Sequence, residues 1–323
     1  MAMATGTAIL EAFYQAAGQF VPADHLAKLL KTSAGQVVAE ITGLEQLGYS
    51  IESHPHFGYR LLDAPDRLTA DDIKARLHTV AIGSQILVFE QTSSTNDVVE
   101  HMAPSQAGEG LVVFAESQTK GRGRHGRAWV SPRGKGLWFS VLLRPKLKPV
   151  AAARITVAAS VAVARAVRKT TGLDARIKWP NDITVRDKKV AGILTELHAE
   201  GDEILAAILG IGIDVNCRVE ELPANIATSL QIETGKPQDR AALAIETLTA
   251  LDECYRAAQT NFDALVTEWA AWCTTLGKQL VVTMGARRIE GHAQALDDDG
   301  ALLLRRDNGQ IERILAGDVV VEK

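Results

Sequence analysis

The sequence predicts a multidomain α+β protein in which two small domains flank a larger one built on a mixed sheet. Its 323 residues exceed what one ordinary hydrophobic core serves. The chain begins with short amphipathic helices, alternates strands with helices through its middle, and ends in closely spaced short strands, which separates three regions. We expect the domains to span residues 1–66, 67–275 and 276–323.

The first domain is predicted to be a winged helix-turn-helix. One helix opens at Val21–Pro22, and a second opens at Ser33, because Ser33-x-x-Gln36 is a capping-box pattern followed by apolar residues at helical spacing. After Gly48, the segment YSIESHPHFGYRL has two short alternating stretches around a turn, which predicts a hairpin. A helix, a tight turn, a second helix and a hairpin together indicate the winged motif.

The middle domain is predicted to hold a mixed sheet covered by helices. Several of its apolar runs are continuous, as in strands that are buried on both faces. Long helices over residues 150–171, closed by Gly172, and over roughly 238–275 would cover the sheet. The predicted strands are Gln85–Glu90, Leu111–Glu116, Leu137–Leu143, Ala175–Trp179, Val190–His198 and Ile204–Val215.

The last domain is predicted to be a small SH3-like β-barrel. Asp299–Gly300 and Asn308–Gly309 are strong hairpin signals between short strands. The five predicted strands are Leu280–Thr283, Ile289–Leu296, Ala301–Arg305, Gln310–Ile314 and Val319–Val321.

Composition and charge narrow the class of protein. Hydrophobic residues at 46% and charged residues at 23% are typical of a soluble globular protein. The formal net charge of −4 gives no global attraction to nucleic acid, so any phosphate binding must come from a local patch. The cysteines Cys217, Cys254 and Cys273 are far apart and form no CxxC pair, which argues against a disulfide framework or a zinc site and fits a reducing cytoplasm.

One stretch resembles a membrane span in composition. Val150–Thr171 is the most apolar part of the chain, but it carries arginines and a lysine that are costly in a bilayer. The N-terminus has neither a charged n-region nor a cleavage motif. We therefore expect a cytoplasmic protein with no membrane association.

The segment TKGRGRHGRAW, residues 119–129, is the most informative part of the chain. Guanidinium groups chelate phosphate or carboxylate oxygens, and glycine lets backbone N–H groups approach an anion closely. Like charges at this density repel one another, so we expect a loop that is mobile when empty and orders around a polyanion. A solvated basic loop is the alternative, with arginine-rich RNA binding a lesser one. The residues concerned are Lys120, Arg122, Arg124, Arg127, Gly121, Gly123 and Gly126.

Familiar nucleotide-binding motifs are excluded. Gly121-x-Gly123-x-x-Gly126 matches the dinucleotide fingerprint, but RAWVSPRGKG follows it, and this is not a helix. The sequence contains neither GxxxxGK[ST] nor the HRD and DFG motifs of kinases. Binding of ATP would therefore need another kind of site.

Two further segments place polar side chains near strand ends. In KWPND (178–182), Asn181 and Asp182 follow a strand, where ligand sites of open sheets are built, although a plain turn explains the same letters. Lys189 starts an apolar strand, so it either extends out to solvent or holds a charge at the mouth of a pocket.

Small residues mark two other candidate sites. In GIGIDVN (210–216), Gly210 and Gly212 let a ligand or a strand lie close, and Asp214 and Asn216 would face polar partners. The cluster at 93–96 is either a helix N-cap or a set of hydroxyl and amide groups that bind a small ligand.

Together and in this order, these segments resemble bacterial biotin–protein ligases of the bifunctional ligase and repressor type. The resemblance covers essentially the whole chain. It runs through SSTN (93–96), ESQTKGRGRHGRAW (116–129), KWPND (178–182), KVAGIL (189–194), GIGIDVN (210–216) and ATSL (227–230).

The resemblance implies a central α/β ligase domain of the class II aminoacyl-tRNA synthetase-like type. It also implies an enzyme that uses ATP and Mg²⁺ to convert biotin to biotinyl-5′-AMP, and then transfers biotin to a lysine of the biotin carboxyl carrier protein of acetyl-CoA carboxylase. A homodimer, and an N-terminal domain that binds operator DNA, belong to the same expectation.

The resemblance also assigns roles to single residues. Biotin would contact Ser94, Thr95, Asn96, Gln118, Arg122, Gly123, Arg124, Lys189, Gly192 and Gly210. ATP and the adenylate would contact Arg124, Arg127, Trp129, Lys178, Asn181, Asp182, Lys189, Asp214 and Asn216. The expected catalytic residues are Lys189, Arg122, Arg124 and Asp182, and the expected Mg²⁺ ligands are Asp182 and Asp214.

Two features depart from the family pattern. Asp214 stands where the family usually has asparagine, and an extra carboxylate near phosphates repels them unless it binds Mg²⁺. We therefore expect a steeper Mg²⁺ dependence than in an Asp214→Asn variant. The predicted recognition helix, residues 33–47, has no lysine or arginine, whereas DNA binding draws much of its affinity from cations. DNA binding and a structural or interaction role both stay open for this domain.

Two other functions compete with the biotin ligase. A lipoate-type ligase on the same fold would differ in its acid substrate. A transcription regulator that senses the adenylate would bind it and yet modify no carrier.

Overall fold

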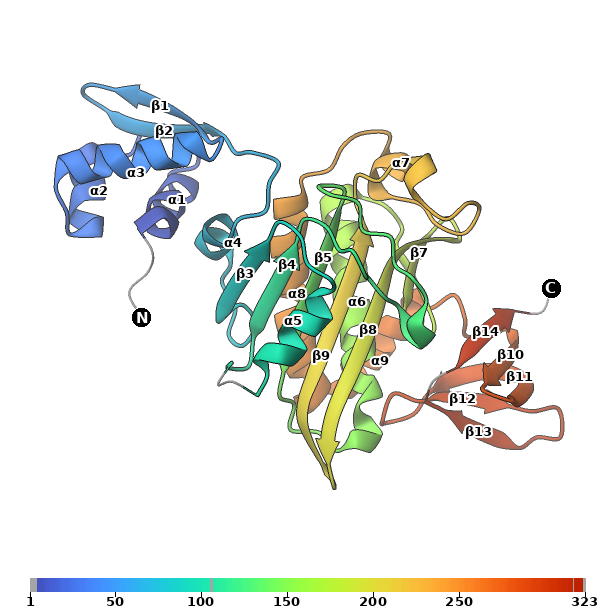
Figure 1. Ribbon diagram of the computed structural model, residues 1–323. Helices are drawn as coiled ribbons and strands as arrows, with labels where there is room; N and C mark the ends of the chain where they lie inside the picture. The colour runs from blue at the N-terminus through green and yellow to red at the C-terminus, as the bar shows by residue number, and fades with distance from the viewer. Residues whose placement is uncertain (1–4, 105–106, 316, 322–323) are drawn as a thin grey trace. The chain divides into compact units, whose positions relative to one another are not determined.

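The computed structural model describes residues 5–104, 107–315 and 317–321 (Figure 1). It divides into two compact units. The first comprises Met1–His78 with Asp239–Ala241, and the second comprises Thr79–Gln238 with Ala242–Lys323.

The N-terminal unit contains the predicted helices and hairpin. Its elements are α1 (Thr5–Gln15), α2 (Ala23–Leu30), α3 (Ala34–Gln46), β1 (Ser50–His54), β2 (Gly58–Asp63) and α4 (Ala70–Arg76). Ile9, Leu26 and Ile41 from the first three helices meet in its core. The hydroxyl of Ser33 accepts a hydrogen bond from the backbone N–H of Gln36 at 3.3 Å, as the capping pattern predicts.

The N-terminal unit extends beyond the predicted boundary at residue 66. The hydroxyls of Thr7 and Tyr14 on α1 donate to Asp71 and Asp72 on α4, and Ile73 is fully buried. Helix α4 therefore packs on α1 and belongs to this unit, which runs to His78. The sequence reading missed this because a seven-residue helix has too short an apolar pattern to show which domain it joins.

The second unit is built on a seven-stranded mixed sheet, as predicted (Figure 1). Only the first two strands along the sheet are parallel, and every other pair is antiparallel. In spatial order the strands are β3 (Gln85–Phe89), β4 (Leu111–Ala115), β5 (Gly136–Leu143), β9 (Glu203–Asp214), β8 (Lys188–Glu200), β7 (Asp182–Val185) and β6 (Arg176–Lys178). Strand β7 was not predicted, because it is only four residues long and begins at Asp182, the last residue of KWPND.

Helices cover both faces of this sheet. On one face, Val99 of α5 (Thr95–Met102) packs against Leu142 of β5 and Ile208 of β9. On the other face, Thr156 of α6 (Ala153–Thr171) hydrogen-bonds Thr195 of β8. Alternate residues of each strand therefore face α5 and α6.

Helix α6 is the stretch whose composition resembles a membrane span. Residues Pro149–Thr171 are long and apolar enough to cross a bilayer, but two thirds of that apolar window (67%) is buried inside the protein. Gly172 ends α6 with a φ of 73°, and its N–H donates to the carbonyl of Arg168, as predicted.

The predicted long helix over residues 238–275 is two helices. Helix α8 (Arg240–Thr260) ends before Asn261, whose extended φ of −150° breaks the helix, and α9 (Phe262–Trp272) begins after it. A short helix α7 (Leu230–Thr234) and three 3₁₀ turns, η1 (Arg124–Gly126), η2 (Pro149–Ala151) and η3 (Val219–Glu221), complete the helical elements of the described residues.

The C-terminal region forms five antiparallel strands, as predicted. Their spatial order is β13 (Ile311–Ile314), β12 (Leu302–Arg305), β11 (Arg287–Leu296), β10 (Gln279–Met284) and β14 (Asp318–Val321). Leu280, Val282 and Leu304 are fully buried in its core.

Gly58 joins the hairpin to the segment before α2 and gives a testable prediction. Its φ is 94°, and an added Cβ would lie 2.1 Å from the carbonyl oxygen of Val21, which pairs with Tyr59. Gly18 has a similar φ of 82° but open space around it. We expect Gly18→Ala to cost about 1 kcal/mol, and Gly58→Ala roughly twice that or more. Hydrogen exchange of the hairpin amides in increasing urea measures both, and equal losses would contradict the steric argument.

Candidate active site

A cavity of about 630 Å³ lies on the face of the sheet that α5 covers. This volume suits a small-molecule site. Sixteen of the seventeen predicted site residues line it, including the whole set from Ser94 to Asn96, the loop arginines, Lys178, Asn181, Asp182, Lys189 and Asp214. The exception is Asn216. Its amide nitrogen donates to the carbonyl of Gln238 and its amide oxygen accepts from the N–H of the same residue, so the side chain ties two backbone segments together outside the cavity lining.

Glycines on the sheet make room for two side chains, those of Trp129 and Asn96. Gly192 of β8 pairs with Gly212 of β9, and Gly210 pairs with Leu194 in the same ladder. An added Cβ at Gly192 or Gly212 would lie 2.9 or 2.7 Å from the ring of Trp129. At Gly210 it would lie 2.3 Å from the amide oxygen of Asn96. The glycines therefore let Trp129 and Asn96 lie directly on the backbone of the sheet.

Polar side chains at the start of α5 form a connected network at one end of the cavity. The backbone N–H and hydroxyl of Thr95 both donate to the amide oxygen of Gln118, at 2.8 and 3.2 Å. Ser140 of β5 donates to the hydroxyl of Thr95 and to the amide oxygen of Asn96. Thr95, Asn96 and Ser140 are almost fully buried, so their hydrogen bonds fix their orientations.

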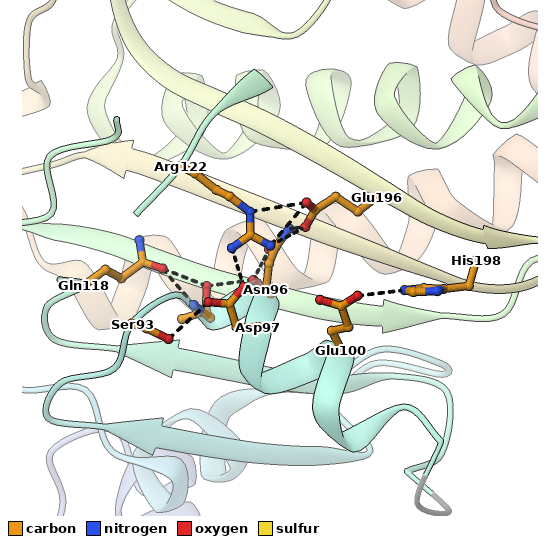
Figure 2. Close-up of polar contacts among 10 residues, drawn as sticks. Ser93, Asn96, Asp97, Glu100, Gln118, Arg122, Glu196 and His198 are labelled. Carbon is orange, nitrogen blue, oxygen red and sulfur yellow. Dashed lines mark hydrogen bonds and ion pairs between the residues drawn. The ribbon is translucent and has the colours of Figure 1, made fainter. Parts of the chain in front are cut away.

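The glycine-rich loop is folded back on itself. The N–H of Gly123 donates to the carbonyl of Arg127 at 2.7 Å, and the N–H of Trp129 donates to Gly121 at 2.9 Å. The tip of this small hairpin is η1, where His125 has a φ of 56°. The sequence reading expected order only around a bound polyanion. The structure shows backbone pairing within the loop, and contacts from Arg122 to Asp97 of α5 and Glu196 of β8 (Figure 2).

A lysine and an aspartate that both line the cavity are in contact. The Nζ of Lys189 lies 2.5 Å from Asp182 and 5.1 Å from the ring centroid of Trp129, a cation–π arrangement. Strand β8 has a bulge beside it, because Ile183 pairs with Ala191 while the next residue of β7 pairs with Lys189. The extra residue turns Lys189 to the face of Gly192, which no sequence pattern indicates.

The loop also contacts the KWPND segment. The guanidinium of Arg124 donates to the amide oxygen of Asn181 at 3.3 Å and to the carbonyl of Gly317 at 3.1 Å. The other end of the Asn181 amide donates to the carbonyl of Ile193 on β8. Segments that are separate in sequence, the loop, KWPND and KVAG, are thus joined at one cavity.

Comparison with known proteins assigns this arrangement to a family. A model of the biotin/lipoate A/B protein ligase family matches residues 88–214, and a model of the biotin protein ligase C-terminal domain matches residues 275–321. The bifunctional ligase/repressor BirA of Bacillus subtilis is 34% identical over 96% of this chain and 97% of its own length.

The chain belongs to the biotin–protein ligase family.

Other relatives agree. A biotin–[acetyl-CoA-carboxylase] ligase of Paracoccus denitrificans is 33% identical over 69% of this chain and 95% of its own length. Among solved structures, the biotin protein ligase of Aquifex aeolicus in complex with biotin and ATP matches with a TM-score of 0.63 and 30% identity, over 74% of this chain and 99% of that one.

Asp214 stands where the sequence resemblance led us to expect asparagine, and its environment explains how this ligase accommodates it. The side chain is only 4% exposed, and the thiol of Cys217 donates to it at 3.7 Å. Burial raises the pKa of the Asp214 carboxyl to about 8. The group is therefore protonated at neutral pH and is uncharged, like the asparagine amide. The reason to expect repulsion of phosphates is removed.

The two expected Mg²⁺ ligands do not by themselves form a site for a resident ion. Asp182 is paired with Lys189, and burial raises the pKa of the Asp214 carboxyl. Within the described residues, no group of three histidine, cysteine or acidic side chains is arranged to hold a metal ion.

Several residues that support the cavity lining were not predicted from the sequence. Glu196 of β8 and Asp97 of α5 contact the loop, and Ser140 supports the polar network. Alternation along β8 places Glu196 on the same face as Gly192, but only the strand register shows that this face is the cavity wall. The backbone segment 222–227 also lines the cavity, near the ATSL motif.

Asp214 gives a pH-dependent prediction. An aspartate whose pKa rises from 3.8 to about 8 on folding loses stability as the pH rises between these values, because the unfolded chain releases the proton first. Asp214→Asn removes this loss. We expect the variant to be more stable than the parent by up to about 5 kcal/mol at pH 7.5, with the gain shrinking towards pH 4. Thermal unfolding across pH measures it, with exposed Asp202→Asn as the control. A gain independent of pH would contradict the assignment.

Proposed function

We propose that this ligase converts biotin and ATP to biotinyl-5′-AMP and pyrophosphate, and then transfers biotin to a lysine of a carrier protein. The observation that carries the proposal is the single cavity, which joins a buried network of neutral polar groups to a cluster of cations. The neutral network at Thr95, Asn96 and Gln118 suits the ureido ring of biotin. The cations Arg124 and Lys189 suit the carboxylate and the phosphates. The Aquifex aeolicus relative, whose structure holds biotin and ATP, supports the same reading.

The first step joins an acid to a phosphate. An oxygen of the biotin carboxylate attacks the α-phosphorus of ATP, the bond from phosphorus to the bridging oxygen breaks, and pyrophosphate leaves. Negative charge grows on the phosphate oxygens in the transition state. Lys189, held in place by Asp182 and by the Trp129 ring, is positioned to stabilise that charge.

The second step makes an amide. The neutral amine of a carrier lysine attacks the carbonyl carbon of the mixed anhydride, and AMP leaves. The attacking nitrogen must lose a proton, and Asp182 is the acidic group that we propose to accept it. The hairpin of loop residues over the cavity protects the anhydride from water.

The name of one relative suggests the carrier, and the chemistry of ATP suggests the metal. Because the Paracoccus denitrificans relative is named for acetyl-CoA carboxylase, we propose that the carrier is the biotin carboxyl carrier protein of that enzyme. Mg²⁺ would enter on the phosphates of ATP, since Mg²⁺ prefers substrate phosphates and water to all-protein sites.

The flanking domains belong to the proposal as well. Three helices followed by a hairpin support a winged helix-turn-helix, and five antiparallel strands support an SH3-like barrel. Relatives named ligase/repressor support operator binding as a second function. A homodimer and a cytoplasmic location complete the proposal.

Lys189 allows a direct test of the proposed chemistry. Lys189→Ala should lower biotin-dependent exchange of labelled pyrophosphate into ATP by about 10²–10³, because a charge contact to the phosphate is lost. The control is Lys188→Ala, which removes an exposed lysine one position away. Lipoate in place of biotin should give no exchange. Exchange with lipoate alone would favour the lipoate-type ligase, and adenylate binding without exchange would favour a regulator.

The charge of the first three helices and the hairpin, residues 5–63, gives a prediction for DNA binding. Helix α3 carries no lysine or arginine, Lys28 and Lys31 of the α2 region are exposed, and Arg60 is paired with Glu52. If this unit binds DNA, the slope of log K against log salt should be about −2 per chain, since each phosphate contact contributes roughly −0.9. Fluorescence anisotropy with operator fragments measures the slope. A slope three times steeper would show that other cations take part.

A further inference from the structure

Arg154, at the start of α6, contacts elements that are far apart in the chain. Its Nε donates to the main-chain carbonyl of Asp298, in the turn between β11 and β12, at 2.7 Å. Its Nη1 donates to the carbonyl of Ala258 at 3.4 Å, and its guanidinium carbon lies 4.6 Å from the ring centroid of Phe262. One side chain thus joins the C-terminal strands, β10–β14, to α6 and to the junction of α8 and α9.

The break between α8 and α9 provides the fixed side of this contact. Because α8 ends before Asn261, the last carbonyls of α8 have no following helical turn to pair with, and Ala258 belongs to that last turn. A cation is favourable at the negative end of the helix dipole. The same guanidinium lies over the buried ring of Phe262, which adds a cation–π contact. Arg154 is therefore held by α8 and α9, with its Nε left to bind the C-terminal strands.

The turn that receives Arg154 has a well-defined shape and lies close to α6. The Asp297 carboxylate accepts from two backbone N–H groups of the turn, at 3.0 and 2.8 Å. Gly300 has a φ of 86°, and an added Cβ there would lie 3.1 Å from the backbone nitrogen of Arg154. The absence of a side chain at Gly300 therefore lets the turn pack directly on the backbone at the start of α6.

The C-terminal strands also supply part of the cavity wall. Gly317, just before β14, and Val319 of β14 line the cavity together with Asn181 and Lys189. Strand β14 pairs with β10, β10 with β11, and β11 with β12, so this wall and the turn at Arg154 belong to one hydrogen-bonded sheet (Figure 1). A shift of the turn relative to α6 would therefore move the wall relative to the rest of the cavity.

We propose that Arg154 is a positioning residue of this ligase, which fixes the C-terminal strands against α6 and so keeps Gly317 and Val319 in the wall of the cavity. The strands are also attached where the chain enters them, because the N–H of Thr274 donates to Ile177 and the N–H of Trp179 donates to the hydroxyl of Thr275. One attachment at a covalent link leaves rotation about that link free. The contact of Arg154 with a different turn removes this freedom.

The consequence for ligand binding rests on the proposed function, in which Arg124 and Lys189 contact the phosphates of ATP. The carbonyl of Gly317 accepts from Arg124 at 3.1 Å, which places the wall beside the proposed phosphate contacts. The proposed partners of biotin, Thr95 and Asn96, are instead held by Ser140 of β5. Loss of the Arg154 contact should therefore weaken the binding of ATP more than that of biotin.

The position of the C-terminal strands can be measured in the protein without ligands. Spin labels at Asp202→Cys and Asp307→Cys would occupy two exposed turns, one between β8 and β9 and one between β12 and β13. The background is Cys273→Ser, since the other two cysteines are buried. Double electron–electron resonance then gives the distribution of distances between the labels. We expect Arg154→Met to broaden this distribution about twofold, because domains that share a small interface move relative to one another.

Arg168 provides the matched control on the same helix. Its Nε donates to the carbonyl of Ala175 at 2.9 Å, and its guanidinium carbon lies 4.7 Å from the ring centroid of Trp272. Arg168→Met therefore removes the same kinds of contact from α6, but at a place outside the C-terminal strands. The distance distribution should stay as narrow as in the parent.

Two substitutions in the turn test the contact from its other side. Asp298→Ala should leave the distribution unchanged, because Arg154 binds the main-chain carbonyl and not the carboxylate. Gly300→Ala should broaden it as Arg154→Met does, because the added Cβ meets the backbone of α6. Arg154→Lys keeps one donor for the carbonyl and should give an intermediate width.

Steady-state pyrophosphate exchange provides the functional readout. Arg154→Met should raise the KM for ATP about three- to tenfold, because the complete wall is then present in only a fraction of the molecules. The KM for biotin should stay within about twofold, and Arg154→Lys should recover part of the loss. A general loss of stability would lower the fraction of active enzyme without this difference between the two substrates.

Three outcomes would overturn the proposal. One is a distance distribution in Arg154→Met as narrow as in the parent, and another is equal broadening in Arg168→Met, which would indicate a general loosening of α6. The third is a broadened distribution with an unchanged KM for ATP. Because the distances are measured without ligands, a parent protein with no biotin-dependent exchange would refute the proposed function and still leave the attachment of the strands tested.

Discussion

The active site depends on the two-residue period of three neighbouring strands. Alternate residues of β5, β9 and β8 face α5, and at this face the ladder brings Ser140 against Gly210 and Gly192 against Gly212. At the glycine positions of this face, which have no side chain, α5 and the loop approach the backbone of the sheet closely. A one-residue slip of β8 would turn Glu196 to the α6 face and Thr195 into the cavity. The register of β8 against β9 is therefore the constraint on which both the shape and the polarity of the site rest.

The charges of the site are arranged in pairs. Lys189 faces Asp182, and Arg122 faces Asp97 and Glu196, so acidic partners fix the positions of both cations. Fixed charges need little reorganisation when a reaction develops charge, which is the main physical route by which enzymes stabilise transition states. The two groups of pairs serve different ends. The Lys189 pair lies where the carboxylate and phosphate meet in the proposed reaction, and the Arg122 pairs join the loop to α5 and β8.

Asp214 shows how burial changes the charge of a side chain. From the sequence GIGIDVN alone, an aspartate here adds a negative charge beside phosphates. In the folded protein it is 4% exposed, its pKa is raised to about 8, and it is neutral at pH 7. Asn216, two residues away in the same motif, has a structural role. Its amide hydrogen-bonds the backbone of Gln238 and so ties the end of β9 to the segment before α8. Membership of a motif therefore predicts proximity to the site better than it predicts contact with the ligand.

The sequence by itself determined the types of element, the family and most of the cavity lining. Helix and strand periods, glycine turns and the motif segments are local patterns, and the loop, KWPND and KVAG indeed meet at one cavity. Only the tertiary structure decided which residues Glu196 contacts and to which face the β8 bulge directs Lys189. It also decided that α4 belongs to the N-terminal unit and that burial raises the pKa of Asp214. The physical reason is that these features depend on strand register, on burial and on contacts between residues far apart in the chain, which no local pattern of letters records.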